Sequence, residues 1–168
     1  MLSAGGRVID VGMVRAHAMS LSREHFIREY PGYYLVVTPH PEALNIGYRT
    51  VNMTIENVRQ SNYDSAFDIV PVTKAPQNPY PDRVSVGRAT NCDIVLRDAS
   101  VSKLHAHFHD FDKGPLRVID LGSSNGTKVN NAPIEAQKSM VLEPGDTLQI
   151  GGAKARVADG DALYEFLR

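Results

Sequence analysis

The chain has 168 residues, with 18 lysines and arginines against 19 aspartates and glutamates, and a formal net charge of -1. This length suits one domain of roughly 100–150 residues plus an extension. The balanced charge excludes a global field that would attract nucleic acid or an anionic membrane, so recognition of an anion has to be local.

The compartment is predicted from the cysteine count and the apolar runs. A single cysteine, Cys92, excludes an internal disulfide framework and fits a reducing environment. The N-terminus has no continuous apolar core of the signal-peptide type, and no run approaches the ~20 apolar residues that cross a bilayer. We therefore expect a cytoplasmic protein without a membrane partner.

The first part of the chain predicts one helix. Apolar residues recur there at positions i, i+7, i+8 and i+11, which places them on one helical face: Met19, Phe26, Ile27 and Tyr30. Pro31 and Gly32 would end this helix, because proline and glycine both interrupt helical structure.

Short apolar stretches follow the predicted helix. Residues 33–37 read as a buried strand, and the alternation at 51–55 fits a strand or a short helix. Residues 1–66 are thus expected to form a small mixed α/β extension. Three roles stay open for it: completing the next domain, mediating dimerisation or contacting a kinase.

The second part of the chain predicts an all-β sandwich or barrel, because short apolar alternations are separated by turn residues at regular intervals. The expected strands are 68–72, 84–88, 93–96, 104–111, 116–120, 127–130, 146–150 and 155–158. Residues 75–82 contain three prolines and are expected to be an extended connection. Asn130 and Asn131 fit a two-residue hairpin turn, since asparagine tolerates positive φ. The last residues, 159–168, predict a short amphipathic helix.

Four short motifs stand at predicted loop positions. They are Gly87-Arg88, the segment 102–105 (Ser-Lys-Leu-His), the segment 123–127 (Ser-Ser-Asn-Gly-Thr) and Val129-Asn130. In this order and on a β-rich frame, the chain resembles the forkhead-associated (FHA) domain, a β-sandwich that binds phosphothreonine peptides. The resemblance implies an FHA-type sandwich of two antiparallel sheets over residues 67–158, with residues 159–168 as a C-terminal helix.

The resemblance also implies roles for individual residues. The residues expected to contact phosphothreonine or the adjoining peptide backbone are Arg88, Ser102, Lys103, Ser124 and Asn125. The residues expected to support the site are Gly87, His105, Gly126, Thr127 and Asn130.

The chemistry of phosphate fits this residue set. Phosphothreonine carries about −1.5 to −2 charge and three acceptor oxygens. A guanidinium fork forms charge-assisted bonds with such a group, and hydroxyl and backbone donors complete its solvation. Arg88 supplies the fork, Ser102 a hydroxyl, and Lys103 a backbone N–H and a second positive charge.

The chain departs from the family pattern at two positions. Lys103 stands where an arginine is common, which keeps the charge but loses bidentate geometry. Asn131 stands where a glycine is frequent. Neither change removes a phosphate donor, and both bear on the choice of peptide residue after the phosphothreonine.

The expected function is therefore a non-catalytic signalling adaptor without cofactor or metal. Its partner would be a phosphothreonine-containing protein, either a Ser/Thr kinase or a kinase substrate, and not nucleic acid. The alternative is an assembly module that uses the same frame, or the extension, to hold a partner without phosphate.

Two enzymatic alternatives involve the histidines. His105, His107 and His109 alternate along one predicted strand and superficially resemble the ligand loop of metallo-β-lactamase-type hydrolases, yet three imidazoles on a flat strand converge poorly on zinc. Ser102 and His105, with Asp120 as an orienting acid, would suit a nucleophile and base, although no nucleophile elbow accompanies them.

Overall fold

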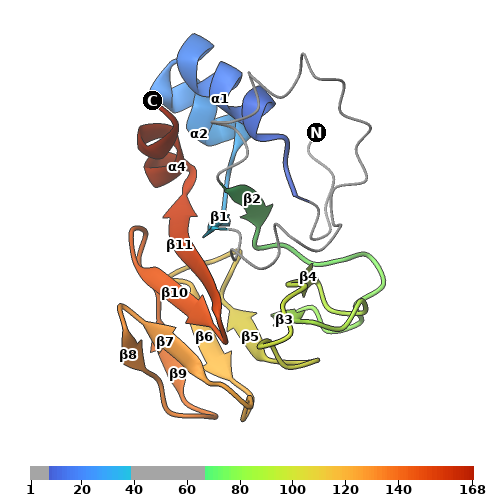
Figure 1. The fold of residues 1–168 in the computed structure, drawn as a ribbon. Coiled ribbons are helices and arrows are strands. Elements are labelled where there is room, and N and C mark those ends of the chain that lie inside the picture. The colour runs from blue at the N-terminus through green and yellow to red at the C-terminus, as the bar shows by residue number, and fades with distance from the viewer. Residues whose placement is uncertain (1–7, 39–66) are drawn as a thin grey trace, which may run out of the picture.

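Two β-sheets pack against each other and enclose the main hydrophobic core. The computed structural model describes residues 8–38 and 67–168. In these residues the sheets form the body of the molecule, three helices gather at one end, and strands β6 to β9 lie at the other (Figure 1). The all-β sandwich with a C-terminal helix, as predicted from the sequence, is confirmed.

The first sheet has six strands in the order β2-β1-β11-β10-β7-β8. Their bounds are Asp68–Pro71 (β2), Tyr33–Thr38 (β1), Ala153–Asp159 (β11), Thr147–Ile150 (β10), Thr127–Val129 (β7) and Ala132–Pro133 (β8). Every pair in this sheet for which a register is defined is antiparallel.

The second sheet has five strands in the order β4-β3-β5-β6-β9. Their bounds are Ile94–Val95 (β4), Arg83–Gly87 (β3), Ala106–His109 (β5), Arg117–Asp120 (β6) and Ser139–Val141 (β9). The pair β3–β4 is parallel, and the other pairs are antiparallel.

Alternation along the strands places side chains in the core. In β5, Ala106 and Phe108 are fully buried, whereas His107 and His109 point to the other face and are partly exposed. Successive side chains of a strand point to opposite faces, so this pattern is the expected one. Residues of both sheets share one buried cluster, in which Phe108 and Leu148 are fully buried.

The helical end contains two N-terminal helices where the sequence predicted one. Helix α1 spans Val11–Ser20 and α2 spans Arg23–Glu29, and Ser22 caps α2 by accepting a bond from the backbone N–H of His25. The expectation of a single helix is therefore wrong, because Ser22 takes an extended conformation and starts a new helix.

The predicted apolar face is divided by this break. Phe26 and Tyr30 are buried, but Met19 is 63% exposed and Ile27 is 36% exposed. Phe26 stacks on Tyr30 at 4.5 Å between ring centroids and tilts against Tyr164 at 5.3 Å. Tyr164 belongs to α4, Gly160–Leu167, whose N-cap is Asp159. The helices thus share a second hydrophobic cluster that continues onto β1.

The position of strand β1 settles one of the three roles that were left open for the N-terminal extension. It lies between β2 and β11, with Val36 opposite both Ile69 and Arg156. This strand therefore completes the sandwich. The alternation predicted at 51–55 lies outside the described residues.

The observed strands differ from the predicted ones at only a few places. Segments β8 and β9 were not predicted, because all their residues are exposed and no buried alternation marks them. The hairpin at Asn130 and Asn131 is confirmed by the pairing of Val129 with Ala132. Asn130 and Asn131 have φ of 49° and 67°, so both asparagines adopt the left-handed conformation.

None of the helices in residues 8–38 and 67–168 combines the length and the apolar character that a bilayer-crossing helix needs.

The helical cluster predicts a matched pair of stability effects. Phe26→Ala should lower the free energy of unfolding by about 3–5 kcal/mol, because it removes a fully buried ring. Ile27→Ala, on the exposed side of the same helix, should change it by less than about 1 kcal/mol. Urea denaturation of both variants checks this, and equal losses would contradict the packing described for α2.

Candidate functional site

Three loops meet beside one end of the second sheet. One follows β3, one connects β4 with β5, and one connects β6 with β7. Backbone bonds run between the first two, from the N–H of Arg88 to the carbonyl of Ser102 at 2.9 Å and from the N–H of Ala89 to the carbonyl of Lys103 at 3.0 Å. The third is joined through the bond from Leu121 N–H to the carbonyl of His105, at 3.0 Å.

Gly87 permits the close approach of the first two loops. A Cβ atom at this position would lie 2.2 Å from the carbonyl oxygen of Lys103. Gly87 is not among the residues with positive φ. The glycine is therefore explained by space for the neighbouring backbone, and not by a need for positive φ.

His105 is the internal support of the loop cluster. Its side chain is completely buried. Its Nδ1 accepts a bond from the backbone N–H of Ser102 at 3.1 Å, so this nitrogen carries no proton. Nε2 then carries the proton and donates to the carbonyl of Gly126 at 3.0 Å. One neutral imidazole thus connects the loop before β5 with the loop before β7.

Asp120 holds the third loop, a role that the sequence analysis missed. The carboxylate is buried, and its Oδ1 accepts backbone N–H bonds from Gly122 and Ser123 at 2.8 and 2.9 Å. Its Oδ2 accepts bonds from the hydroxyls of Ser123 and Thr127, both at 2.6 Å. Burial acts to raise the pKa of Asp120, but these hydrogen bonds together hold the pKa below its usual value. The spacing of an aspartate with Gly and Ser two and three positions later was the available signal.

Arg88 is fixed at one nitrogen and open at the other two. The residue is exposed, and its Nε donates to the carbonyl of Val101 at 3.1 Å. In the described part of the chain its guanidinium has no carboxylate partner. Because Nε is held, both terminal NH₂ groups remain available as a fork for an anion. Lys103 is also exposed, and its ammonium has no partner among the described residues.

The hydroxyls of two serines and the amide of Asn125 belong to the same loop cluster as Arg88. Ser102 Oγ accepts the backbone N–H of Ser124 at 3.1 Å, which leaves its own proton free to donate. Ser124 is exposed, and its hydroxyl has no partner among residues 8–38 and 67–168. Asn125 donates from Nδ2 to the carbonyl of Ser100 at 2.8 Å, so one of its two N–H groups holds the adjacent loop. The structure therefore brings Ser102, Ser124 and Asn125 into one cluster with Arg88.

The remaining predicted support residues differ in their distance from this cluster. Gly126 has φ of 76°, a conformation that favours glycine. Thr127 is 1% exposed and contacts Asp120. Asn130 lies farther away and stabilises the turn before β10, since its Nδ2 donates to Asp146 at 2.9 Å and its Oδ1 accepts from Thr147 at 3.0 Å.

The two enzymatic alternatives do not fit the geometry. Both ring nitrogens of His105 are bonded to backbone groups, so neither is available to activate the Ser102 hydroxyl. Asp120 is occupied by its own loop. In the described ranges no three His, Cys, Asp or Glu side chains lie where they could hold a metal ion.

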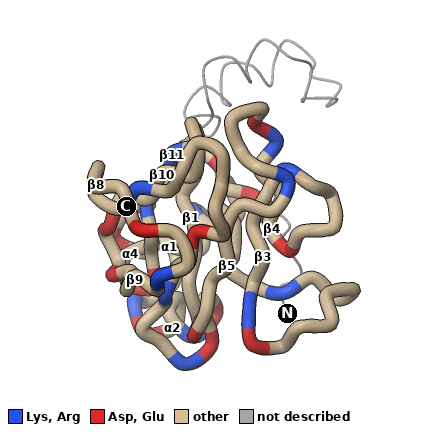
Figure 2. The backbone as a smooth tube through the Cα atoms, turned by 90° about the horizontal axis from the view of Figure 1, so that it is seen from below, with Lys and Arg blue, Asp and Glu red and all other residues tan. Residues whose placement is uncertain are grey.

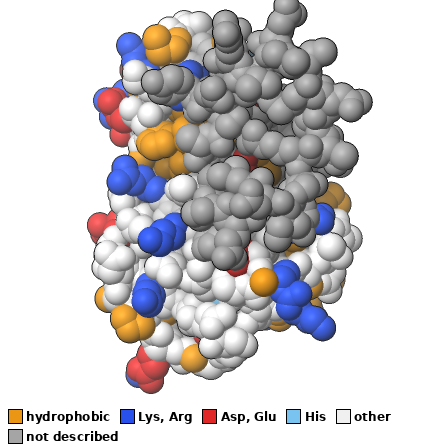
Figure 3. All heavy atoms as spheres, in the orientation of Figure 1, with side chains coloured by type: hydrophobic (Ala, Val, Ile, Leu, Met, Phe, Trp, Pro, Cys, Tyr) orange, Lys and Arg blue, Asp and Glu red, His pale blue; other side chains and the backbone are white. Residues whose placement is uncertain are grey.

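Charges are mixed over most of the surface. Figure 2 shows acidic and basic positions interspersed around the described backbone. Figure 3 shows basic side chains over the β3–β4 region and also along the β10–β11 side of the face that it presents. The charge available for an anion at the loop cluster is that of Arg88 and Lys103, which agrees with the need for local recognition in a chain of balanced composition.

The comparisons with known proteins point to one family. Residues 84–151 match the family model of the FHA domain. The glycogen accumulation regulator GarA of Mycolicibacterium smegmatis is 46% identical over 67 residues, which is 40% of each chain. The oxoglutarate dehydrogenase inhibitor of Corynebacterium efficiens is 45% identical over 67 residues, 40% of this chain and 44% of its own.

A solved FHA structure, described as part of an analysis of phosphothreonine-dependent FHA domain interactions, is 30% identical. It covers 47% of this chain and 78% of its own, with a TM-score of 0.42. The match to the two curated relatives spans less than half of their length.

Asp120 predicts a pH-dependent loss of stability. Its pKa is lowered in the folded protein, so it stabilises the fold above its unfolded pKa of about 4 and loses this effect as the pH falls through the folded value. Asp120→Asn should therefore cost about 2–3 kcal/mol at neutral pH, because bonds to the charged carboxylate are lost.

Chemical denaturation between pH 7 and pH 3 measures this difference, which should shrink toward acid. A penalty that stays constant over this range would show that the charge of Asp120 does not hold the loop.

Proposed function

Because this chain belongs to the forkhead-associated (FHA) domain family, we propose that it binds phosphothreonine-containing segments of partner proteins at the Arg88 loop cluster. The observation that carries this proposal is the state of Arg88. Its guanidinium is exposed, held at Nε, and free of carboxylates within the described residues. A guanidinium in this state is organised for an external anion.

The surrounding donors suit a tetrahedral, doubly charged group. Ser102 and Ser124 offer hydroxyls and Lys103 offers an ammonium, and the loop that carries Ser102 and Lys103 is bonded to the loop that carries Arg88. Phosphate has three strongly accepting oxygens, so it can use several of these donors at once. A hydrogen bond to a charged group contributes about 1.5–3 kcal/mol. After the cost of ordering a peptide, micromolar affinity is expected, about −8 kcal/mol.

Asn125 gives the site a contact to the peptide itself. One N–H of its amide is bonded to Ser100, and the amide oxygen and the second N–H remain for a peptide backbone. The amide is also held in place before the ligand arrives. This arrangement would favour a phosphorylated peptide over inorganic phosphate.

The role in the cell is proposed to be regulatory and not catalytic. Two relatives carry the names of a regulator and an inhibitor, which supports a module that acts by binding. The partner would be a Ser/Thr kinase or one of its substrates in the cytoplasm. We place the binding unit in residues 67–158, completed by β1.

Replacement of the guanidinium tests the site directly. Arg88→Ala should lower affinity for a phosphothreonine peptide library at least ~100-fold, because the charge-assisted bonds are lost. Arg88→Lys should recover only part of the affinity, since it keeps the charge without the fork. Isothermal titration calorimetry measures both variants.

The control is Arg156→Ala, which removes an exposed arginine from β11 in the other sheet and should bind as the parent does. Unchanged binding by a folded Arg88→Ala variant would refute the site. Partner capture that is indifferent to phosphatase treatment would instead favour the phosphate-independent assembly module.

A further inference from the structure

A cleft of about 510 Å³ opens on the outer face of the second sheet, next to the Arg88 loop cluster. Its volume lies in the range of sites that receive small ligands or side chains. The lining residues come from β3, β5 and three loops.

The cleft is continuous with the proposed phosphate site. Ala89 and Lys103 line it, and they directly follow Arg88 and Ser102 in the two loops that are bonded to each other. No residue of the loop 121–126 lines it. Along the segment that precedes β5, Ser100 and Ser102 face Asn125 and its neighbour, whereas the following residues face the cleft.

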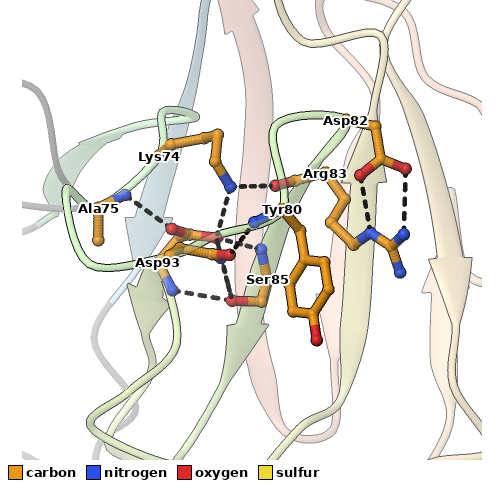
Figure 4. Close-up of polar contacts among 8 residues, drawn as sticks. Lys74, Ala75, Tyr80, Asp82, Arg83, Ser85 and Asp93 are labelled. Atoms are coloured by element: carbon orange, nitrogen blue, oxygen red, sulfur yellow. Dashed lines mark hydrogen bonds and ion pairs between the residues drawn. The ribbon is translucent and has the colours of Figure 1, made fainter.

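A buried carboxylate fixes one wall of the cleft. Asp93, only 3% exposed, accepts bonds from the backbone N–H groups of Ala75 and Ser85, both at 2.7 Å. It also accepts a short bond from Nδ2 of Asn78, and Lys74 approaches it at 4.0 Å. These contacts tie the proline-rich connection 75–82 to β3 (Figure 4).

An exposed aromatic ring is held at this wall. The backbone N–H of Tyr80 donates to the amide oxygen of Asn78 at 3.0 Å. Arg83 lies over the Tyr80 ring at 4.9 Å and is itself held by two 3.1 Å bonds to Asp82 (Figure 4). Tyr80 is nevertheless 56% exposed, so its ring contacts Arg83 without being covered.

The rest of the surface of the cleft is suited to an apolar group. Leu104 is 48% exposed at its edge. His107 lines the cleft too, and burial first, then the charge of Arg83, lowers the pKa of this imidazole and favours its neutral form. A fixed aromatic ring and an aliphatic side chain in a cleft are typical of a pocket that receives a hydrophobic anchor.

We propose that this cleft receives an apolar side chain of the same phosphopeptide, on the side of the phosphothreonine that points away from Asn125. This inference rests on the proposed function. It assigns a second, independent recognition element to the peptide, built from Tyr80 and Leu104. The bound peptide would thus cross the phosphate site with Asn125 on one side and a hydrophobic contact on the other.

The test uses alanine-rich 13-residue peptides with a central phosphothreonine. Leucine is placed in turn at each of the four positions before and after it, and affinities for the full chain are measured by fluorescence polarisation. Leucine should improve affinity about five- to tenfold at one or two positions, all on one side. Tyr80→Ala and Leu104→Ala should each remove this gain while leaving the all-alanine phosphopeptide unaffected.

Met140→Ala on β9, 41% exposed and outside the cleft, is the matched control and should keep the full gain.

Equal weakening of the leucine and all-alanine peptides by Tyr80→Ala, or no effect on either, would overturn the inference while phosphopeptide binding itself stands. Loss of self-association in Tyr80→Ala, seen by sedimentation without peptide, would overturn it in favour of a second copy as occupant. Absence of any phosphopeptide binding by the parent would refute the proposed function and this inference together.

Discussion

A single buried imidazole determines the arrangement of the proposed binding surface. His105 accepts a bond from one loop and donates to another, and both partners are backbone groups. The Asp120 carboxylate also lies near this imidazole, with Oδ2 3.6 Å from Nε2. The loop that contains Ser102 and the loop that contains Gly126 are therefore held together before a ligand binds, which lowers the free-energy cost of binding.

Two buried carboxylates, Asp120 and Asp93, hold two further segments of the chain. Asp120 collects the donors of the loop that carries Ser124 and Asn125, and Asp93 collects those of the connection beside β3. Each is buried and each has hydrogen bonds to several donors, as a buried charge requires. Both carboxylates are buried and bonded to the frame, whereas the exposed charged side chains of the proposed site are Arg88 and Lys103.

The sequence predicted the strands of the sandwich more completely than the contacts around the binding residues. The strand pattern between 68 and 158 and the hairpin at 130–131 follow from alternation and turn chemistry, and the structure has them. The break at Ser22 and the strand β9 could not be predicted, because a capping serine and an exposed edge strand leave little periodic signal. The clustering of Arg88 with Ser102 was implied by family resemblance, whereas the bonds of Asp93 depend on contacts between distant segments that spacing does not encode.

The placement of β1 has a consequence for how the chain reaches this structure. Val36 lies between Ile69 and Arg156, so this interior strand pairs with the strand that follows all the others in the described residues. Pairing these strands closes a very long loop, and the loss of chain entropy on closing that loop opposes formation of the sheet. Assembly should accordingly be slow, on the order of milliseconds to seconds. The segment that matches the family model, residues 84–151, contains none of β1, β2 and β11, although these are three adjacent strands of the first sheet. We expect cooperative folding to need them as well.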